Sequence, residues 1–149
     1  MSKIVLLNRV ATVVFIIVSL FTAVVFSSTL RVVIVAVSLV LFAIGVAAFL
    51  LGYFAAVQRS REEEIAVTQL FFLAGEVAPK KVRLAMWYCL GAQCVVGLGV
   101  ALARPSTDGR SGSVMAFAVM VPMLGIGLNG LWAGKYGSFG PRQLKTQAE

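Results

Sequence analysis

An uncharged apolar run from residue 10 to residue 30 limits the possible folds of this chain more than any other feature. Arg31 is the only charged residue between this run and Val57. An α-helix needs about 20 apolar residues to cross the hydrocarbon core of a bilayer. The runs of this kind predict membrane spans at about residues 10–27, 32–57, 84–103 and 114–133. We therefore expect an all-α integral membrane protein with a single domain of four transmembrane helices.

Composition supports a chain that is mostly surrounded by lipid. Of its 149 residues, 60% are hydrophobic and only 13% are charged, whereas soluble domains have nearer a quarter charged residues. The net charge of +7 does not indicate a nucleic-acid partner, because the basic residues flank apolar runs and do not cluster with exposed aromatic residues. The two cysteines, Cys89 and Cys94, lie inside one span and are expected to be buried, unpaired residues.

The first span follows a basic start, as a cleaved signal peptide also would. Signal peptides have an apolar region of about 7–15 residues. The run in this chain is longer, and a second span follows it almost at once. These two facts favour a first helix that stays in the mature protein.

Short polar connections indicate two antiparallel helical hairpins. Ser27, Ser28, Thr29 and Arg31 form a brief link between the first two spans, which must therefore run in opposite directions. The linker at residues 104–113 is rich in Gly, Ser and Pro and predicts an exposed loop. Pro122 lies within the fourth span and is expected to kink the helix or to mark its outer third.

The distribution of Lys and Arg predicts the orientation. One side of the membrane receives most of the basic residues: Lys3, Arg9, Arg59, Arg61, Lys80, Lys81, Arg83, Lys135, Arg142 and Lys145. The opposite side receives Arg31, Arg104 and Arg110. By the positive-inside rule, both termini are expected to face the cytoplasm. Aromatic residues agree, since Tyr53, Trp87, Tyr88, Trp132 and Tyr136 are all predicted at the inner interface.

The segment between the second and third spans predicts a short interfacial helix at about residues 61–74. Ser60 and Glu63 have the spacing of a capping box, and Gly75 is suited to end the helix. Such a helix is too short to cross a bilayer, so it is expected to lie in the cytoplasmic interface or beneath the spans. The alternative is that this segment docks a partner, through Glu62, Glu63, Glu64, Phe71 and Phe72.

The spans contain no Asp, Glu, Lys, Arg or His, and the whole chain contains no His. Transport of ions or protons usually depends on ionisable residues inside the membrane. The few acidic residues form no recognisable arrangement with a nucleophile, a base or a metal. We therefore expect a protein that is not an enzyme, with no catalytic residue, no cofactor and no metal site.

Polar and small residues within the spans are candidates for contacts between helices. Gln93 and Asn129 are the strongest hydrogen-bonding groups, and they either join helices or line a substrate path. Small residues recur at four-residue spacing, which lets helix backbones approach closely in lipid. These stripes are Ser19, Ala23 and Ser27; Ala48, Gly52 and Ala56; Gly97 and Ala101; and Gly130 and Gly134. The chain needs only some of them, so others remain available for a second membrane subunit.

Two stretches, SREEEIAVTQLFFLAGEVAPKKVR (Ser60 to Arg83) and VPMLGIGLNGLWAGKYGSFGPR (Val121 to Arg142), resemble small four-span membrane proteins of actinobacteria. Among these, the chain is similar to an accessory subunit of the cytochrome bcc–aa3 respiratory supercomplex. The resemblance implies a location in the bacterial plasma membrane and a non-catalytic role beside the oxidase. It transfers no catalytic or cofactor residue.

Three functions are compatible with these features. The first is an accessory subunit that packs against larger integral membrane proteins, such as oxidase subunits, and against membrane lipids. The second is a small homo-oligomeric transporter or channel, whose pore would be lined by Gln93, Asn129 and Ser38. The third is a regulatory protein that acts through its central loop.

Overall fold

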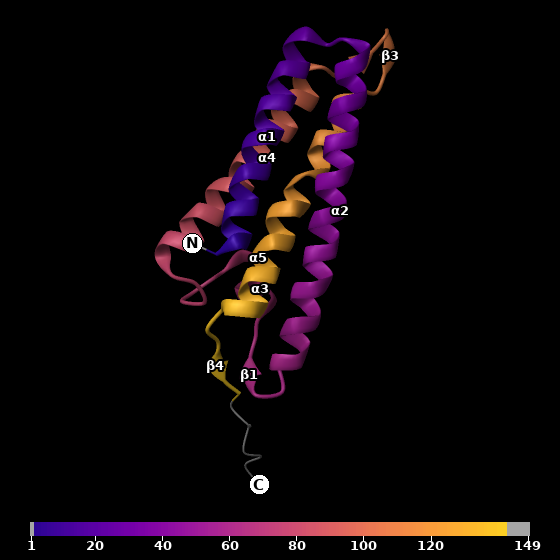
Figure 1. Cartoon of the computed structure of the whole chain (residues 1–149). Helices are drawn as coiled ribbons and strands as arrows, with labels where there is room; N and C mark the ends of the chain where they lie inside the picture. The colour runs from indigo at the N-terminus through magenta and orange to yellow at the C-terminus, as the bar shows by residue number, and fades with distance from the viewer. Residues whose placement is uncertain (1, 143–149) are drawn as a thin grey trace.

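The computed structural model describes residues 2–142, in which the four predicted spans are helical (Figure 1). The elements are α1 (Lys3–Val25), α2 (Ser28–Arg59), α4 (Lys80–Ala103), and a 3₁₀-helix η1 (Val114–Met120) followed by α5 (Pro122–Tyr136). Taking η1 and α5 as one segment, four helices are long and apolar enough to cross a membrane. The prediction of a helical membrane protein with four spans is confirmed at this level.

The turn between the first two spans is tighter than predicted. Only Phe26 and Ser27 separate α1 from α2. Phe26 ends α1 in the left-handed conformation (φ 44°), and its N–H donates to the carbonyl of Thr22. The hydroxyl of Ser27 then accepts from the N–H of Leu30 and caps α2. Ser28 to Arg31, predicted as connection, are therefore the first turn of α2.

Pro122 changes the type of helix in the fourth span. Proline has no N–H and is favoured in the first turn of an α-helix. Accordingly η1 ends at Met120, and α5 begins at Pro122. Of the two predicted roles, Pro122 takes that of a boundary, because it separates the outer 3₁₀ part of the fourth span from the α-helix.

The predicted interfacial helix at residues 61–74 is wrong in extent and in its cap. Only Val67–Phe72 (α3) is helical. Ser60 ends α2, and its hydroxyl donates back to the carbonyl of Val57. Glu63–Glu64 (β1) is extended and pairs antiparallel with Gly140–Pro141 (β4). Ser60 is thus committed to the C-terminus of α2, because the long second helix continues past the predicted boundary.

The end of this short helix also differs from the prediction. Leu73 (φ 51°), and not Gly75, is the left-handed residue that ends α3. The cap at its start is supplied by Gln69, whose side-chain oxygen accepts from the N–H of Ala66. Leu70 and Phe71 are buried, so α3 is packed beneath the spans, one of the two places expected for it.

The most extensive helix contact, between α2 and α5, joins the two hairpins. α2 packs mainly on α5, and α1 packs mainly on α4 (Figure 1). Thr12 contacts Gln93 and Ala23 contacts Arg104, with the same separation of 81 residues in both pairs. A constant separation means that α1 and α4 run in parallel. α2 and α5 also run in parallel, because Gly45 faces Leu124 and Gly52 faces Leu131 further along.

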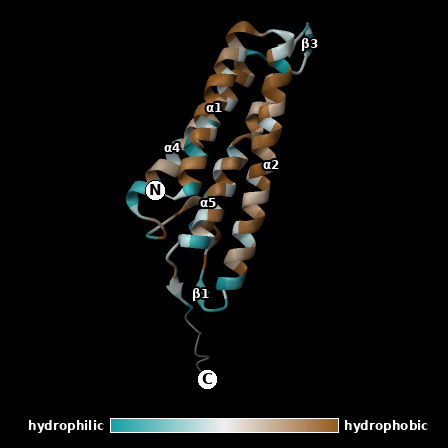
Figure 2. Ribbon diagram, viewed as in Figure 1, coloured by the Kyte–Doolittle hydropathy of each residue, from teal (hydrophilic) through white to brown (hydrophobic). Residues whose placement is uncertain are grey.

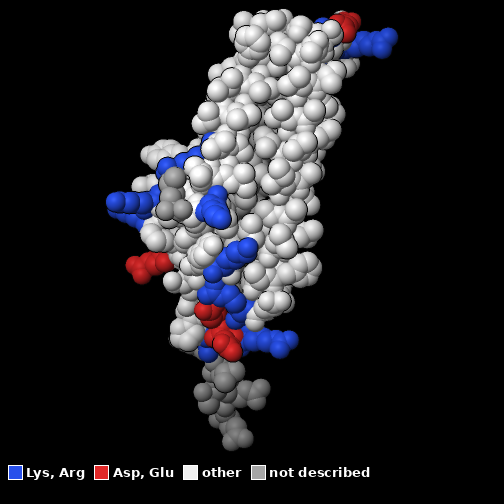
Figure 3. Space-filling model, in the orientation of Figure 1, with Lys and Arg blue, Asp and Glu red and all other residues white. Residues whose placement is uncertain are grey.

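On the viewed face, charged side chains lie at the upper tip and over the lower half of the bundle, and the surface between these two regions is uncharged (Figure 3). The ribbon of this uncharged part is mostly hydrophobic (Figure 2). We call the end that holds Arg59 and Lys80 the basic end. The opposite end, which we call the hairpin end, holds the α1–α2 turn and the small hairpin of β2 (Ser106–Thr107) and β3 (Arg110–Ser111). Lys145, which also contributed to the predicted orientation, lies outside the described residues.

Candidate functional site

A buried cluster of hydrogen bonds surrounds Gln93 and joins three helices. Its side-chain amide donates to the Oδ1 of Asn8 (3.1 Å) and to the Oγ1 of Thr12 (2.7 Å), both on α1. Its Oε1 accepts from the backbone N–H of Gly125 on α5 (3.1 Å). Asn8 in turn donates to the sulfur of Met86. Gln93 is fully buried, and helix-to-helix bonding is therefore the role its contacts describe.

The break at Pro122 explains why Gly125 needs a partner outside its own helix. The N–H of Leu124 donates to the carbonyl of Val121, which continues the 3₁₀ pattern. That carbonyl would be the usual acceptor for Gly125 in an α-helix. An unpaired N–H inside a bilayer costs several kcal/mol, which is about the penalty that a side-chain acceptor removes. Gln93 supplies that acceptor from α4.

Asn129 of α5 forms a hydrogen bond to α3, in the segment between α2 and α4. Its side-chain amide donates to the carbonyl of Phe71 (3.0 Å). A Cβ at Gly130 would meet the ring of Phe71 at 2.5 Å, and that ring stacks on Phe49 of α2 with centroids 4.2 Å apart. Gly130 therefore provides the space into which α3 inserts its aromatic ring.

Arg59 holds together the basic end of α2 and α5. Its guanidinium forms two bonds with the carboxylate of Glu63, at 2.7 and 2.9 Å. It also donates to the carbonyls of Gly134 (3.2 Å) and Gly137 (2.9 Å) and lies over the ring of Phe139. Two parallel helices bring two negative dipole ends together, and a cation placed there is favourable. Arg59 thus caps the C-terminus of α5 from its own position in the last turn of α2.

A second arginine, Arg104, joins α1 to α4 at the hairpin end. Arg104, just after α4, donates to the carbonyl of Ala23 near the end of α1 (3.0 Å). The ring of Phe26 has Arg104 at 4.9 Å and Arg31 at 4.6 Å from its centroid. Arg31 also forms an ion pair with Asp108 on the β2–β3 turn (2.8 Å).

Most of the predicted small residues make contacts within this chain. Ala48 is buried on α2, and a Cβ at Gly52 would collide with the backbone of Gly130. Added atoms at Gly134 would meet the carbonyl of Gly52 at 3.0 Å. The predicted stripes on α2 and α5 are therefore the surfaces by which those two helices contact each other.

The remaining predicted small residues are divided between interior and surface positions. A Cβ at Gly97 would meet the carbonyl of Ala118 in η1 at 2.6 Å. Ser19 is fully buried, whereas Ala23 is partly exposed and offers its carbonyl to Arg104. The sequence did not single out Gly45 and Gly127, although a Cβ at Gly127 would collide with the carbonyl of Gly45.

The predicted docking segment does not form one surface. Glu63 is engaged by Arg59, and Phe71 is buried against Gly130. Glu62, Glu64 and Phe72 are exposed or partly exposed. Only these three of the five predicted residues are open to a partner in the part of the chain that is described.

Two glycines of α4 have open space where a side chain would lie. Gly91 and Gly99 lie two helical turns apart on α4, with exposed Val95 between them. A Cβ at either glycine would meet nothing within 4 Å. Exposed Leu98 and Leu102 continue this face of α4 towards the hairpin end.

Within residues 2–142 no group of three or more His, Cys, Asp or Glu side chains could hold a metal ion. Comparison of the chain with protein-family models, with curated proteins and with solved structures gives no match. Its function is therefore inferred from the geometry of its helices.

Proposed function

We propose that the protein is a non-catalytic accessory subunit that packs against a larger integral membrane protein through the outer face of α4. The observation that carries this proposal is the exposed pair Gly91 and Gly99. Glycine in a helix interior costs about 1 kcal/mol relative to alanine. Elsewhere in the bundle, glycines such as Gly127 are required by a neighbouring backbone. The neighbour that would require Gly91 and Gly99 belongs to another subunit, because small residues permit close helix approach in lipid.

The partner that we propose is a subunit of a respiratory cytochrome c oxidase supercomplex in a bacterial plasma membrane. The resemblance of the sequence to an actinobacterial accessory subunit supports this assignment. We also propose that both termini face the cytoplasm, since the basic end carries most of the Lys and Arg residues.

Purification of the tagged full-length chain from its native membranes in mild detergent tests the proposal. We expect a larger membrane protein to co-elute in fixed ratio, and haem absorbance in the eluate to identify the oxidase. The double variant Gly91→Leu and Gly99→Leu is expected to lose this partner and to keep its thermal stability. A matched control, Ala43→Leu and Ala47→Leu, changes exposed small residues of α2 and should retain the partner. Elution of the wild-type chain as a lone monomer would contradict the proposal.

A transporter or channel is the second candidate, and one observation favours it. The hydroxyls of Ser19 and Ser38 and the Oδ1 of Asn129 are buried with no hydrogen-bond partner among the described residues. Buried polar atoms of this kind are often satisfied by water. Flux through liposomes that contain the purified chain, abolished by Gln93→Leu, would support this candidate over the first.

A further inference from the structure

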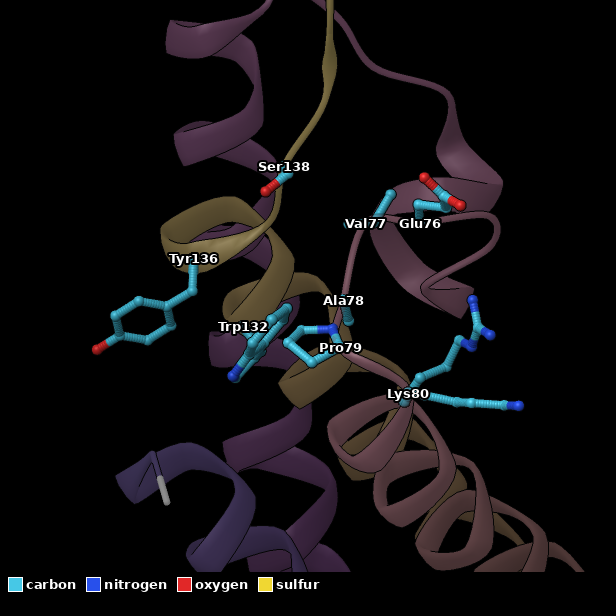
Figure 4. A pocket seen from close by; sticks show the side chains of 9 residues that line it. Glu76, Val77, Ala78, Pro79, Lys80, Trp132, Tyr136 and Ser138 are labelled. Atoms are coloured by element: carbon cyan, nitrogen blue, oxygen red, sulfur yellow. The ribbon is translucent and has the colours of Figure 1, made fainter.

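A cavity of about 570 Å³ opens at the basic end, where residues 76–79 cross from α3 to the first turn of α4 (Figure 4). Pro79 lies in the middle of its wall. The side chain of Lys80 extends on one side of Pro79, and the rings of Trp132 and Tyr136 lie on the other side (Figure 4). Arg83 also lines the cavity. We call this feature the Pro79 cavity.

The basic side chains that line the Pro79 cavity are available to bind an anion. Lys80 is exposed and forms no ion pair within residues 2–142. Arg83 donates to the carbonyl of Gly75, which holds its guanidinium beside the loop. Glu76 is the one acidic residue among those that line the cavity, so the two cations leave an excess of positive charge there.

The aromatic side of the cavity is built rigidly. The rings of Trp132 and Tyr136 lie 5.9 Å apart between centroids. The indole N–H of Trp132 donates to the hydroxyl of Ser2 (3.1 Å), which fixes the ring. The hydroxyl of Tyr136 has no hydrogen-bond partner among the described residues, and more than half of this side chain is exposed.

The cavity lies at the start of a candidate membrane span, where lipid headgroups are expected. Lys80 is the first residue of α4, one of the four helices able to cross a membrane. Lysine, arginine, tryptophan and tyrosine gather at this level in membrane proteins, where phosphate, glycerol and the first methylene groups of the lipid meet. A free phosphate ion would use the cations and leave the aromatic side without a ligand.

We propose that the Pro79 cavity binds the headgroup of one anionic phospholipid. The phosphate lies against Lys80 and Arg83, and the glycerol packs on the exposed ring of Tyr136, which Trp132 supports from behind. This assignment requires only that the helices lie in a membrane. It is therefore independent of which protein packs on α4.

Native mass spectrometry of the full-length chain in detergent tests this site. The probes are phosphatidylglycerol and phosphatidylcholine with identical acyl chains. We expect one phosphatidylglycerol to remain bound per chain and phosphatidylcholine to dissociate. Lys80→Gln is expected to weaken phosphatidylglycerol binding by about fivefold, the effect of one basic residue near an anionic lipid. Lys80→Arg, which keeps the charge, should restore it.

The matched control is Lys81→Gln, which removes the same charge from the neighbouring exposed residue. Lys81 does not line the cavity, and we expect its loss to change binding by less than a factor of about two. Equal weakening by Lys80→Gln and Lys81→Gln would overturn the proposal in favour of general surface attraction. Equal retention of both lipids would also overturn it. Displacement of phosphatidylglycerol by millimolar inorganic phosphate would show a site for free anions instead. A thermal melt of each variant establishes that it is folded.

Discussion

The α2–α5 contact and the α1–α4 contact join parallel helices by opposite means. Between α2 and α5, glycines bring the two backbones together, as at Gly52 and Gly127. Between α1 and α4, the contact is a set of side-chain hydrogen bonds centred on Gln93. Both pairs are closed at one end by an arginine, Arg59 and Arg104 respectively.

The position of Pro122 explains this difference. The stretch of α5 that meets Gly52 has regular backbone hydrogen bonds, so its surface needs only space. At the start of α5 the backbone pattern changes, and the N–H of Gly125 needs an acceptor that only a polar side chain provides. Gln93 therefore lies where the backbone of α5 lacks an acceptor, and Gly52 meets α5 where its backbone bonding is complete.

Gly127→Leu is the change that should damage the bundle most. A Cβ at this position would collide with the carbonyl of Gly45, and a backbone cannot rotate away as a side chain can. We expect destabilisation of more than about 3 kcal/mol, the upper range for overpacked cores. Unfolding in mixed micelles with increasing SDS measures this loss. Gly99→Leu adds the same side chain where nothing lies within 4 Å, and an equal loss in that control would show that the collision with Gly45 is not the cause.

Gln93→Leu tests the polar contact and should have the second largest effect. The change leaves the Gly125 N–H and the Asn8 side chain without their partner in a dry interior. We expect a loss of about 2 kcal/mol, since single hydrogen bonds in membrane proteins average about 0.6 kcal/mol and a stranded buried group costs more. SDS unfolding also provides this measurement.

A double-mutant cycle with Asn8→Leu then distinguishes a network from isolated bonds. If the cluster acts as a unit, Asn8→Leu in the Gln93→Leu background should cost clearly less than it does alone. Strict additivity of the two losses would show that the cluster is not a network.

The sequence was sufficient for the spans and insufficient for their pairing. Uncharged length alone defines a membrane helix, which is why α4 ends at Ala103 as predicted. Which helices touch depends on three-dimensional packing. Short connections predicted two hairpins, and α4 does contact η1 and α5 within the second one. The facing glycines Gly45 and Gly127 nevertheless place the most extensive contact between hairpins.

The central segment shows how a local motif can be outweighed by tertiary contacts. Ser60 and Glu63 have capping-box spacing, but Arg59 draws the carboxylate of Glu63 towards the end of α5. Pairing with Gly140 and Pro141 then keeps this stretch extended. Residues so distant in sequence could not enter a local prediction. Gln93 and Asn129 were predictable as bonded residues, since an amide in lipid requires a partner.

Loss of either arginine cap should lower stability by less than Gly127→Leu does, and the loss should differ between the two helix pairs. Arg59→Gln loses the Glu63 pair and the contacts with the carbonyls of Gly134 and Gly137, and we expect a cost of about 2 kcal/mol. Arg104→Gln loses a bond to one carbonyl and the contact with Phe26, and about 1 kcal/mol is expected. Thermal melts of both variants in the same detergent give the order. The reverse order would contradict the assignment of Arg59 as the principal cap.

The ion pair between Arg31 and Asp108 should contribute least. The side chain of Asp108 is 70% exposed, and exposed pairs contribute about 0.2–1 kcal/mol because water screens them. A double-mutant cycle of Arg31→Gln and Asp108→Asn should give a coupling of about 0.5 kcal/mol that declines as salt is raised. A salt-independent coupling of several times that size would show that this pair holds the hairpin end. Arg104 and Phe26 would then be secondary to Arg31 in closing the α1–α4 contact.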